Sequence, residues 1–177
     1  MPTKTDVDEN VTPNRDTTHH KGKVVLLGSM YPPEVGALCR RAYSMAVALS
    51  ASGYEVQVVT HLPHYPKRVI FPEYQGKFIC REPEPYGSVL RIKPLLFKKQ
   101  SFLWRSIGEI WFAVWAVLLG VGGRKPKVVF ATSPTMFALF AGRWIATLRR
   151  TPLVVELRDL TWLYATALSP KIGRAHV

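Results

Sequence analysis

The stretch KVVLLGSMYPPEVGALCRR, residues 23–41, decides the fold of this chain. Its first part, Lys23–Leu27, is a short Val and Leu run followed by a glycine, as in a strand buried on both faces of a parallel sheet. Pro32 and Pro33 exclude a helix or a central strand from the next residues. Apolar residues then recur at helical spacing from Ala37 onward. The stretch therefore predicts a strand, a loop and a helix.

The start of the predicted helix is a candidate binding site. Gly36 and Ala37 stand where the helix begins, and the first N–H groups of a helix have no partner within it, so anions bind there. Gly28 and Gly36 are too far apart for the G-x-G-x-x-G fingerprint of dinucleotide-binding proteins. Two interpretations remain: Gly36 lets the backbone approach a ligand, or it only relieves strain at the helix entry.

Length, charge and cysteine content limit the possible functions. The 177 residues suffice for one domain with a sizeable core. The formal net charge of +12 indicates an anionic partner, namely an anionic membrane surface, a phosphorylated substrate or nucleic acid. Cys39 and Cys80 provide neither a disulfide framework nor a metal-binding spacing, which fits a reducing cytosol and predicts no metal site.

Predicted strands and helices alternate along the rest of the chain, which indicates an α/β fold with a doubly wound, Rossmann-like parallel sheet. Residues 61–86 are rich in proline, aromatic and basic residues and are predicted to form one long loop. The further strands are expected at Tyr54–Thr60, Ser88–Lys93, Lys127–Ala131 and Pro152–Leu157, and the further helices at Ile107–Val121 and Met136–Arg150.

A strand order of 3-2-1-4-5 would open a binding crevice between the first and fourth strands. The Gly36 loop and Ser133 would flank this crevice, and Arg158 and Asp159 would border it. His61 follows the second strand and could contact a substrate, although histidines between prolines commonly only pack. These residues form the candidate binding site.

Two helices are expected to have distinct apolar faces. Ile107–Val121 is shorter than the about 20 residues that a membrane span needs, which favours an interfacial helix or a crossover helix that covers the sheet. Its tryptophans and flanking basic residues suit the headgroup region of an anionic membrane. The basic residues are Lys98, Lys99, Arg105, Arg124, Lys125 and Lys127. The later helix is predicted to have an apolar face formed by Met136, Phe137, Phe140, Trp144, Ile145 and Leu148.

Four motifs in a fixed order support a resemblance to a known family. They are YPPEVGA at 31–37, HLPHYP at 61–66, ATSP at 131–134 and ELRDL at 156–160. Together they resemble the N-terminal domain of bacterial family-4 glycosyltransferases of the GT-B fold, especially exopolysaccharide enzymes, over about residues 23–168. The resemblance implies the N-terminal half of a metal-independent, retaining sugar transferase that holds the acceptor and closes over a nucleotide-sugar donor.

The chain also departs from this family. Arg158 stands where many relatives have a sugar-contacting histidine, and the E-x7-E signature of the donor-binding domain is absent from the sequence. We therefore expect half an enzyme, inactive alone, whose catalytic residues lie in a C-terminal domain. Residues 1–22 are expected to be a disordered tail, 23–170 the domain, and 171–177 an artefactual tail, because IGRAHV at 172–177 matches a translated sequencing adapter.

The expected function is therefore transfer of a sugar from a nucleotide-sugar to a lipid-linked saccharide, in exopolysaccharide or cell-surface glycan synthesis. The resemblance implies no cofactor, no metal and no nucleic-acid partner, and a cytoplasmic location at the inner face of the plasma membrane. One alternative is a membrane-anchored, non-enzymatic α/β binding protein built on Ile107–Val121. Another is a nucleic-acid binder suggested by charge alone, although the chain has no motif of a known binding module.

Overall fold

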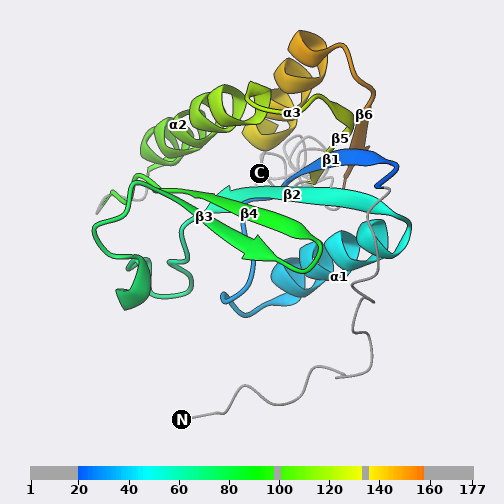
Figure 1. The fold of residues 1–177 in the computed structure, drawn as a ribbon. Helices are drawn as coiled ribbons and strands as arrows, with labels where there is room; N and C mark the ends of the chain where they lie inside the picture. The colour runs from blue at the N-terminus through cyan, green and yellow to red at the C-terminus, as the bar shows by residue number, and fades with distance from the viewer. Residues whose placement is uncertain (1–19, 98–100, 133–135, 158–177) are drawn as a thin grey trace, which may run out of the picture.

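The computed structural model describes residues 20–97, 101–132 and 136–157. Predicted features that fall on other residues, including the N-terminal tail, Ser133, Arg158, Asp159 and the segment after them, lie outside this range. Within it, strands and helices alternate (Figure 1). The elements are β1 (Gly22–Leu27), α1 (Ala37–Ala51), β2 (Tyr54–His61), η1 (Pro72–Tyr74), β3 (Ile79–Glu84), β4 (Gly87–Ile92), α2 (Phe102–Val121), β5 (Pro126–Thr132), α3 (Met136–Arg149) and β6 (Leu153–Glu156).

The strands form one sheet in the order β3-β4-β2-β1-β5-β6. All neighbouring strands are parallel except β3 and β4. The five strands expected from the sequence therefore lie in the predicted order, with β1 beside β5 at the point where the chain reverses its direction across the sheet. This confirms the doubly wound, Rossmann-like arrangement. Its crevice belongs at the carboxyl ends of β1 and β5.

One strand was missed in the predicted loop of residues 61–86. β3 pairs antiparallel with β4 at the edge of the sheet, from Ile79 opposite Ile92 to Glu84 opposite Gly87. Its residues alternate between exposed and half-buried, so its sequence has no apolar run to reveal it. Pro83 argues against a central strand but is tolerated at an edge, where its missing N–H needs no partner. Cys80 consequently lies in a strand rather than in a loop.

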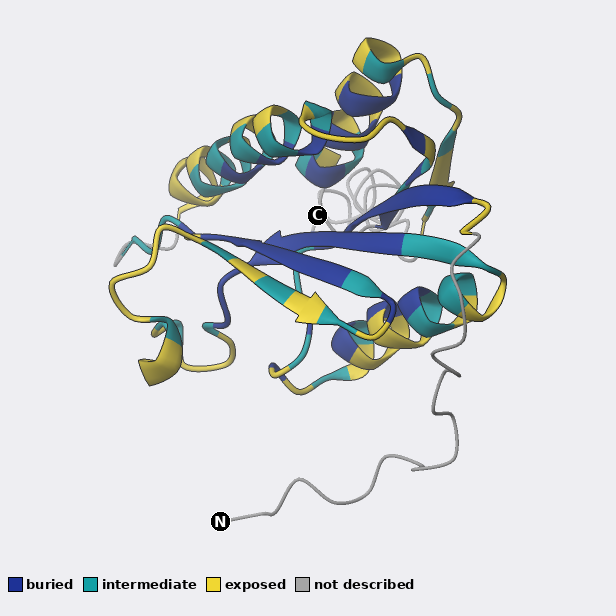
Figure 2. Cartoon of the chain, in the orientation of Figure 1, coloured by how far each residue is buried: buried dark blue, intermediate teal, exposed yellow. Residues whose placement is uncertain are grey.

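The two faces of the sheet are covered differently. α1 packs on one face, and α2 and α3 lie together on the other (Figure 1). Residues of β1 divide accordingly: Val25 and Leu27 belong to the core under α2 and α3, whereas Leu26 belongs to the core under α1. This division follows from the two-residue period of strand side chains. The central strands are dark blue, which marks them as buried, and they lie between these helical layers (Figure 2).

The predicted apolar face of α3 mostly points away from the sheet. The helix buries Ala138, Ala141, Gly142, Ile145 and Ala146, whereas most of the large apolar side chains point outward. Of the residues of the predicted apolar face, Ile145 is buried, Phe137 is half-buried, and Met136, Phe140, Trp144 and Leu148 are exposed. Close packing explains why small residues of α3 face the sheet, because a Cβ at Gly142 would lie 2.8 Å from the Ala131 Cβ. Small residues let α3 approach the sheet closely, which large ones would prevent.

The helix predicted at Ile107–Val121 is longer than expected. α2 begins at Phe102, after Ser101 in an extended N-cap conformation, and has 20 residues. It is therefore long and apolar enough to cross a membrane by length and composition alone. Arg105 and Ser106 hid the first turn of the helix, because they interrupt the apolar run that defined the predicted boundary.

Candidate functional site

The predicted crevice lies where the carboxyl ends of β1, β2, β5 and β6 meet. A Cβ at Gly28, just after β1, would lie 3.3 Å from the Thr132 Cγ2 at the end of β5, so these strand ends are in close contact. Of the six predicted site residues, Gly36, Ala37 and His61 are described. The loops after β1 and β2 therefore carry the geometry of this site.

Gly36 is the N-cap of α1, and Ala37 is its first residue. The Gly36 φ of 161° is extended backbone, which any residue adopts, so relief of strain at the helix entry does not explain this glycine. An added Cβ at Gly36 would have nothing within 4 Å. The first turn of α1 contains no acidic residue. The helix start is therefore open and suited to an anion.

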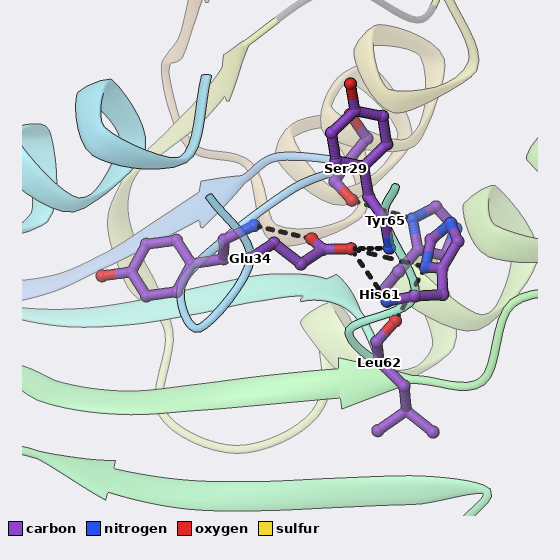
Figure 3. A network of polar contacts seen from close by, with 7 residues as sticks. Ser29, Glu34, His61, Leu62 and Tyr65 are labelled. Atoms are coloured by element: carbon purple, nitrogen blue, oxygen red, sulfur yellow. Dashed lines mark hydrogen bonds and ion pairs between the residues drawn. The ribbon is translucent and has the colours of Figure 1, made fainter. Parts of the chain in front are cut away.

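Glu34 connects the loop after β1 to the loop after β2. Its side chain is fully buried, and its carboxylate accepts the backbone N–H of His64 and of Tyr65, each at 2.9 Å (Figure 3). The same carboxylate accepts the Tyr31 N–H at 3.4 Å. Buried carboxylates require such partners, because desolvation of an unpaired charge is costly. Sequence reasoning missed Glu34, and the only signal for it is its place inside the YPPEVGA motif.

Arg91 of β4 fixes the loop after β1 from a second direction. Its guanidinium is almost fully buried, and Nε donates to the Glu82 carboxylate at 2.7 Å while Nη2 donates to the Pro32 carbonyl. The guanidinium also lies 5.3 Å from the centre of the Tyr74 ring. Edge strand β3 and helix η1 therefore help to hold the loop that leads to Gly36.

His61 ends β2 and is buried. Its Nδ1 lies 3.0 Å from the Ser29 carbonyl oxygen, and because a carbonyl only accepts, Nδ1 carries the proton. The ring packs 4.2 Å from Phe112 of α2. Burial lowers the pKa of His61 to about 4, so the ring is neutral at pH 7 with its lone pair on Nε2. His61 thus joins the strand end to both the β1 loop and α2.

A pocket of about 400 Å³ opens beside His61. It lies between the loop after β2, the segment after β4 and the first turns of α2. Its charged side chains are Arg68, Arg105 and Glu109. The remaining lining is formed by His61, His64, Tyr65, Pro66, Pro94, Leu95, Leu96, Phe97, Trp104 and Gly108. Aromatic rings beside two guanidinium groups can hold a sugar ring that carries an anionic substituent.

Polar contacts also connect β5, β6 and α1 at the predicted crevice. The Thr132 hydroxyl at the end of β5 donates to Glu156 Oε2 of β6 at 2.8 Å. The other oxygen of Glu156 lies 3.4 Å from Arg41 Nε of α1. The fold brings Arg41 of α1 to Glu156 of β6, although the two residues are far apart in the sequence. These residues line the same carboxyl edge as the Gly36 loop.

The described residues contain no group of three His, Cys, Asp or Glu side chains that could hold a metal ion.

A family model described as a glycosyl transferase 4-like domain matches residues 36–176. WcaI of Escherichia coli K12, named as a colanic acid biosynthesis glycosyl transferase, is 29% identical over 139 residues. That match covers 77% of this chain and 34% of WcaI, so the chain spans about a third of the length of this relative.

Two solved structures share the fold. Both are crystal structures of the C-terminal domain of the PF1911 hydrogenase from Pyrococcus furiosus. One superposes with a TM-score of 0.51 at 16% identity, covering 76% of this chain and 91% of that domain. The other has a TM-score of 0.50 at 20% identity and covers 77% and 91%. At these identities the likeness concerns the fold alone.

Proposed function

The chain belongs to the glycosyl transferase 4-like family, and from this premise we propose that it is the acceptor-binding N-terminal half of a retaining glycosyltransferase of the GT-B fold. The enzyme transfers a sugar from a nucleotide-sugar to a lipid-linked saccharide in exopolysaccharide or cell-surface glycan synthesis. The observation that carries this proposal is the Glu34 carboxylate, which ties the open Gly36 loop to the histidine loop at the carboxyl edge of the sheet.

The donor phosphates approach the start of α1. Gly36 leaves open space there, and the helix dipole favours negative charge at this end. No acidic side chain in the first turn competes with a phosphate. Gly36 and Ala37 are accordingly donor-contacting positions, with Ser133, Arg158 and Asp159 proposed to border the same crevice.

The acceptor occupies the pocket beside His61. Trp104 and Tyr65 offer faces for a sugar ring, and Arg68 and Arg105 offer donors to an anionic group. His61 is neutral at pH 7, so its Nε2 can accept a hydrogen bond from a hydroxyl group. The uncharged hydroxyl groups of a saccharide can donate such a hydrogen bond to Nε2.

These 177 residues are proposed to transfer no sugar by themselves. Enzymes of the GT-B fold that the sequence resembles bind the donor mainly through a C-terminal domain, and the chain spans only a third of WcaI. The residues that carry the chemical step are proposed to belong to that domain. Neither a metal nor another cofactor is required in this scheme, and nucleic acid is not a partner.

The site of action is proposed to be the cytoplasmic face of the plasma membrane, where the chain binds peripherally. Arg105 precedes most of α2, and Arg124 and Lys125 follow it, all exposed. Each basic residue near an anionic surface contributes about 1 kcal/mol to binding. Binding to anionic vesicles is therefore expected to weaken as salt concentration rises.

Calorimetric titration of the chain tests the acceptor assignment. We expect a saccharide phosphate to bind, Arg68→Gln and Arg105→Gln to weaken it at least about tenfold, and nucleotide-sugars to bind only weakly. Lys67→Gln is the control, because Lys67 neighbours Arg68 in the chain but does not line this pocket. Turnover of any nucleotide-sugar by the chain alone would contradict the proposal. So would equal affinity of Arg68→Gln, Arg105→Gln and Lys67→Gln for the saccharide phosphate.

A further inference from the structure

The outward sides of α2 and α3 form one apolar surface. Ile110, Val114 and Leu118 recur along α2, and Phe140, Trp144 and Leu148 recur along α3, in both cases every four residues. Each of these six side chains is between 48% and 60% exposed. We call these six residues the two-helix apolar face. In Figure 2, exposed residues alternate with covered ones along both helices, as expected for one outward stripe on each.

The two stripes are connected by a groove. A hollow of about 310 Å³ lies between the helices and is lined by apolar residues from both of them, including Val114, Leu118, Phe140 and Trp144. Contiguous exposed apolar surface of this kind marks a binding site, since isolated apolar residues are common but joined ones are not. The face is therefore a site for an apolar partner.

Charge identifies the partner. Among the described residues of α2 and α3 the only carboxylate is Glu109, which lines the pocket beside His61 instead. Three exposed cations belong to these helices or follow them directly, namely Arg143 of α3 and, after α2, Arg124 and Lys125. Cations beside an apolar face complement anionic headgroups above acyl chains. A second copy of a chain with net charge +12 would bring like charges together.

We propose that the two-helix apolar face inserts into one leaflet of an anionic membrane, with α2 lying along the surface rather than spanning the bilayer. This inference rests on the proposed membrane association of the chain, and it adds α3 to the contact.

Packing excludes the spanning arrangement. Phe112 and Ala116 of α2 belong to the same core as Val25 and Val129 of the sheet, so the second half of the helix is packed against the sheet. A spanning α2 would carry the sheet into hydrocarbon, where open strand edges are not tolerated. Shallow insertion keeps the sheet in water and exposes only the outward stripe to lipid.

Flotation with vesicles of phosphatidylglycerol and phosphatidylcholine tests the proposal on the full 177-residue chain. Leu118→Asp and Phe140→Asp place a carboxylate on each stripe, and each is expected to weaken binding at least about tenfold. Both positions are exposed, so the melting temperature should stay within a few degrees of the wild-type value. Val69→Asp is the matched control, because Val69 is 59% exposed on a different part of the molecule and should leave binding unchanged.

Each other outcome overturns the proposal. Loss of binding with Leu118→Asp but not with Phe140→Asp would indicate that α2 inserts alone. Unchanged vesicle binding by both variants would show that the chain binds the membrane through electrostatic attraction without inserting this face. A dimer in sedimentation experiments without lipid, dissociated by either variant, would show that the face pairs with a second copy. Failure of the saccharide titration would leave these results unaffected, so the two proposals fail separately.

Quenching of tryptophan fluorescence by lipids brominated on the acyl chain provides a second measurement. Trp144 is 59% exposed on the two-helix apolar face, so it is expected to reach the brominated depth. The wild type should be quenched, and Trp144→Phe should lose a large part of that quenching while still floating with the vesicles. Equal quenching in both would place the face outside the bilayer.

Discussion

The Glu34 carboxylate accepts the backbone N–H of His64 at 2.9 Å, across 30 residues of sequence. This bond couples the loop that ends at Gly36 to the loop that borders the acceptor pocket. A buried charge with several backbone donors fixes both loops in one arrangement, because moving either loop would leave the charge unpaired.

Replacing Glu34 should therefore destabilise the domain. Glu34→Ala removes the acceptor from three backbone N–H groups, and we expect a loss of about 3 kcal/mol or more in the free energy of unfolding. Glu34→Gln keeps one acceptor oxygen and should cost less. Urea denaturation measures both, with Glu73→Gln as the control because Glu73 is exposed. Equal stability of Glu34→Ala and the control would show that the carboxylate does not hold the loops.

The buried histidine predicts how stability depends on pH. The pKa of His61 falls from 6.5 in the unfolded chain to about 4 in the folded one because of burial. Between these values the unfolded chain binds the proton and the folded chain does not, so stability falls as pH drops from 6.5 to 4. The contribution of His61 to this loss is about 3 kcal/mol.

His61→Asn tests this dependence. Its amide can donate to the Ser29 carbonyl in place of Nδ1 but does not titrate. The variant is expected to be less stable than the wild type at pH 7, through lost packing on Phe112, and to lose less stability on acidification. Parallel slopes of unfolding free energy against pH between 6.5 and 4 would contradict the assignment.

Most of the architecture could be predicted because it depends on local patterns. The Val and Leu run of β1 and the helical periods of residues 37–51 and 136–149 each act within a few residues. The strand order 3-2-1-4-5 was considered as one typical of doubly wound sheets, and the structure has it. β3 could not be found this way, because an edge strand has no buried face and tolerates Pro83.

The buried face of α3 shows where pattern reasoning fails. A hydrophobic stripe normally marks the side of a helix that faces the core, and Phe140 and Trp144 define such a stripe. In the structure this stripe faces outward, and Ala and Gly residues face the sheet. The close distance between α3 and the sheet determines which face of the helix is buried, and this distance cannot be inferred from the sequence alone. Glu34 was missed for the same reason, since its partners are 30 residues away.

The close contact of α3 with the sheet gives a further prediction. In Gly142→Ala the added Cβ would lie 2.8 Å from the Ala131 Cβ, which is fixed to its strand and cannot rotate away. We expect a loss of about 1–3 kcal/mol, despite the better helix propensity of alanine. Gly122→Ala is the control, because its nearest neighbour would be 3.5 Å away. Equal melting temperatures of Gly142→Ala and Gly122→Ala would show that the interface between α3 and the sheet adjusts to the added methyl group.

Gly36→Val separates ligand binding from folding. The extended φ of Gly36 and the open space around it predict that valine is accepted without strain, so the melting temperature should change by only a few degrees. The branched side chain would nevertheless occupy the space where a phosphate reaches the first N–H groups of α1.

Titration of inorganic pyrophosphate, followed by the amide signals of residues 37–39, is expected to show binding in the wild type and at least about tenfold weaker binding in Gly36→Val. Gly36→Ala adds only a methyl group and should give an intermediate result. Unchanged pyrophosphate affinity in a folded Gly36→Val protein would move the donor site away from this helix start, whereas unfolding of the variant would mean that Gly36 serves the fold.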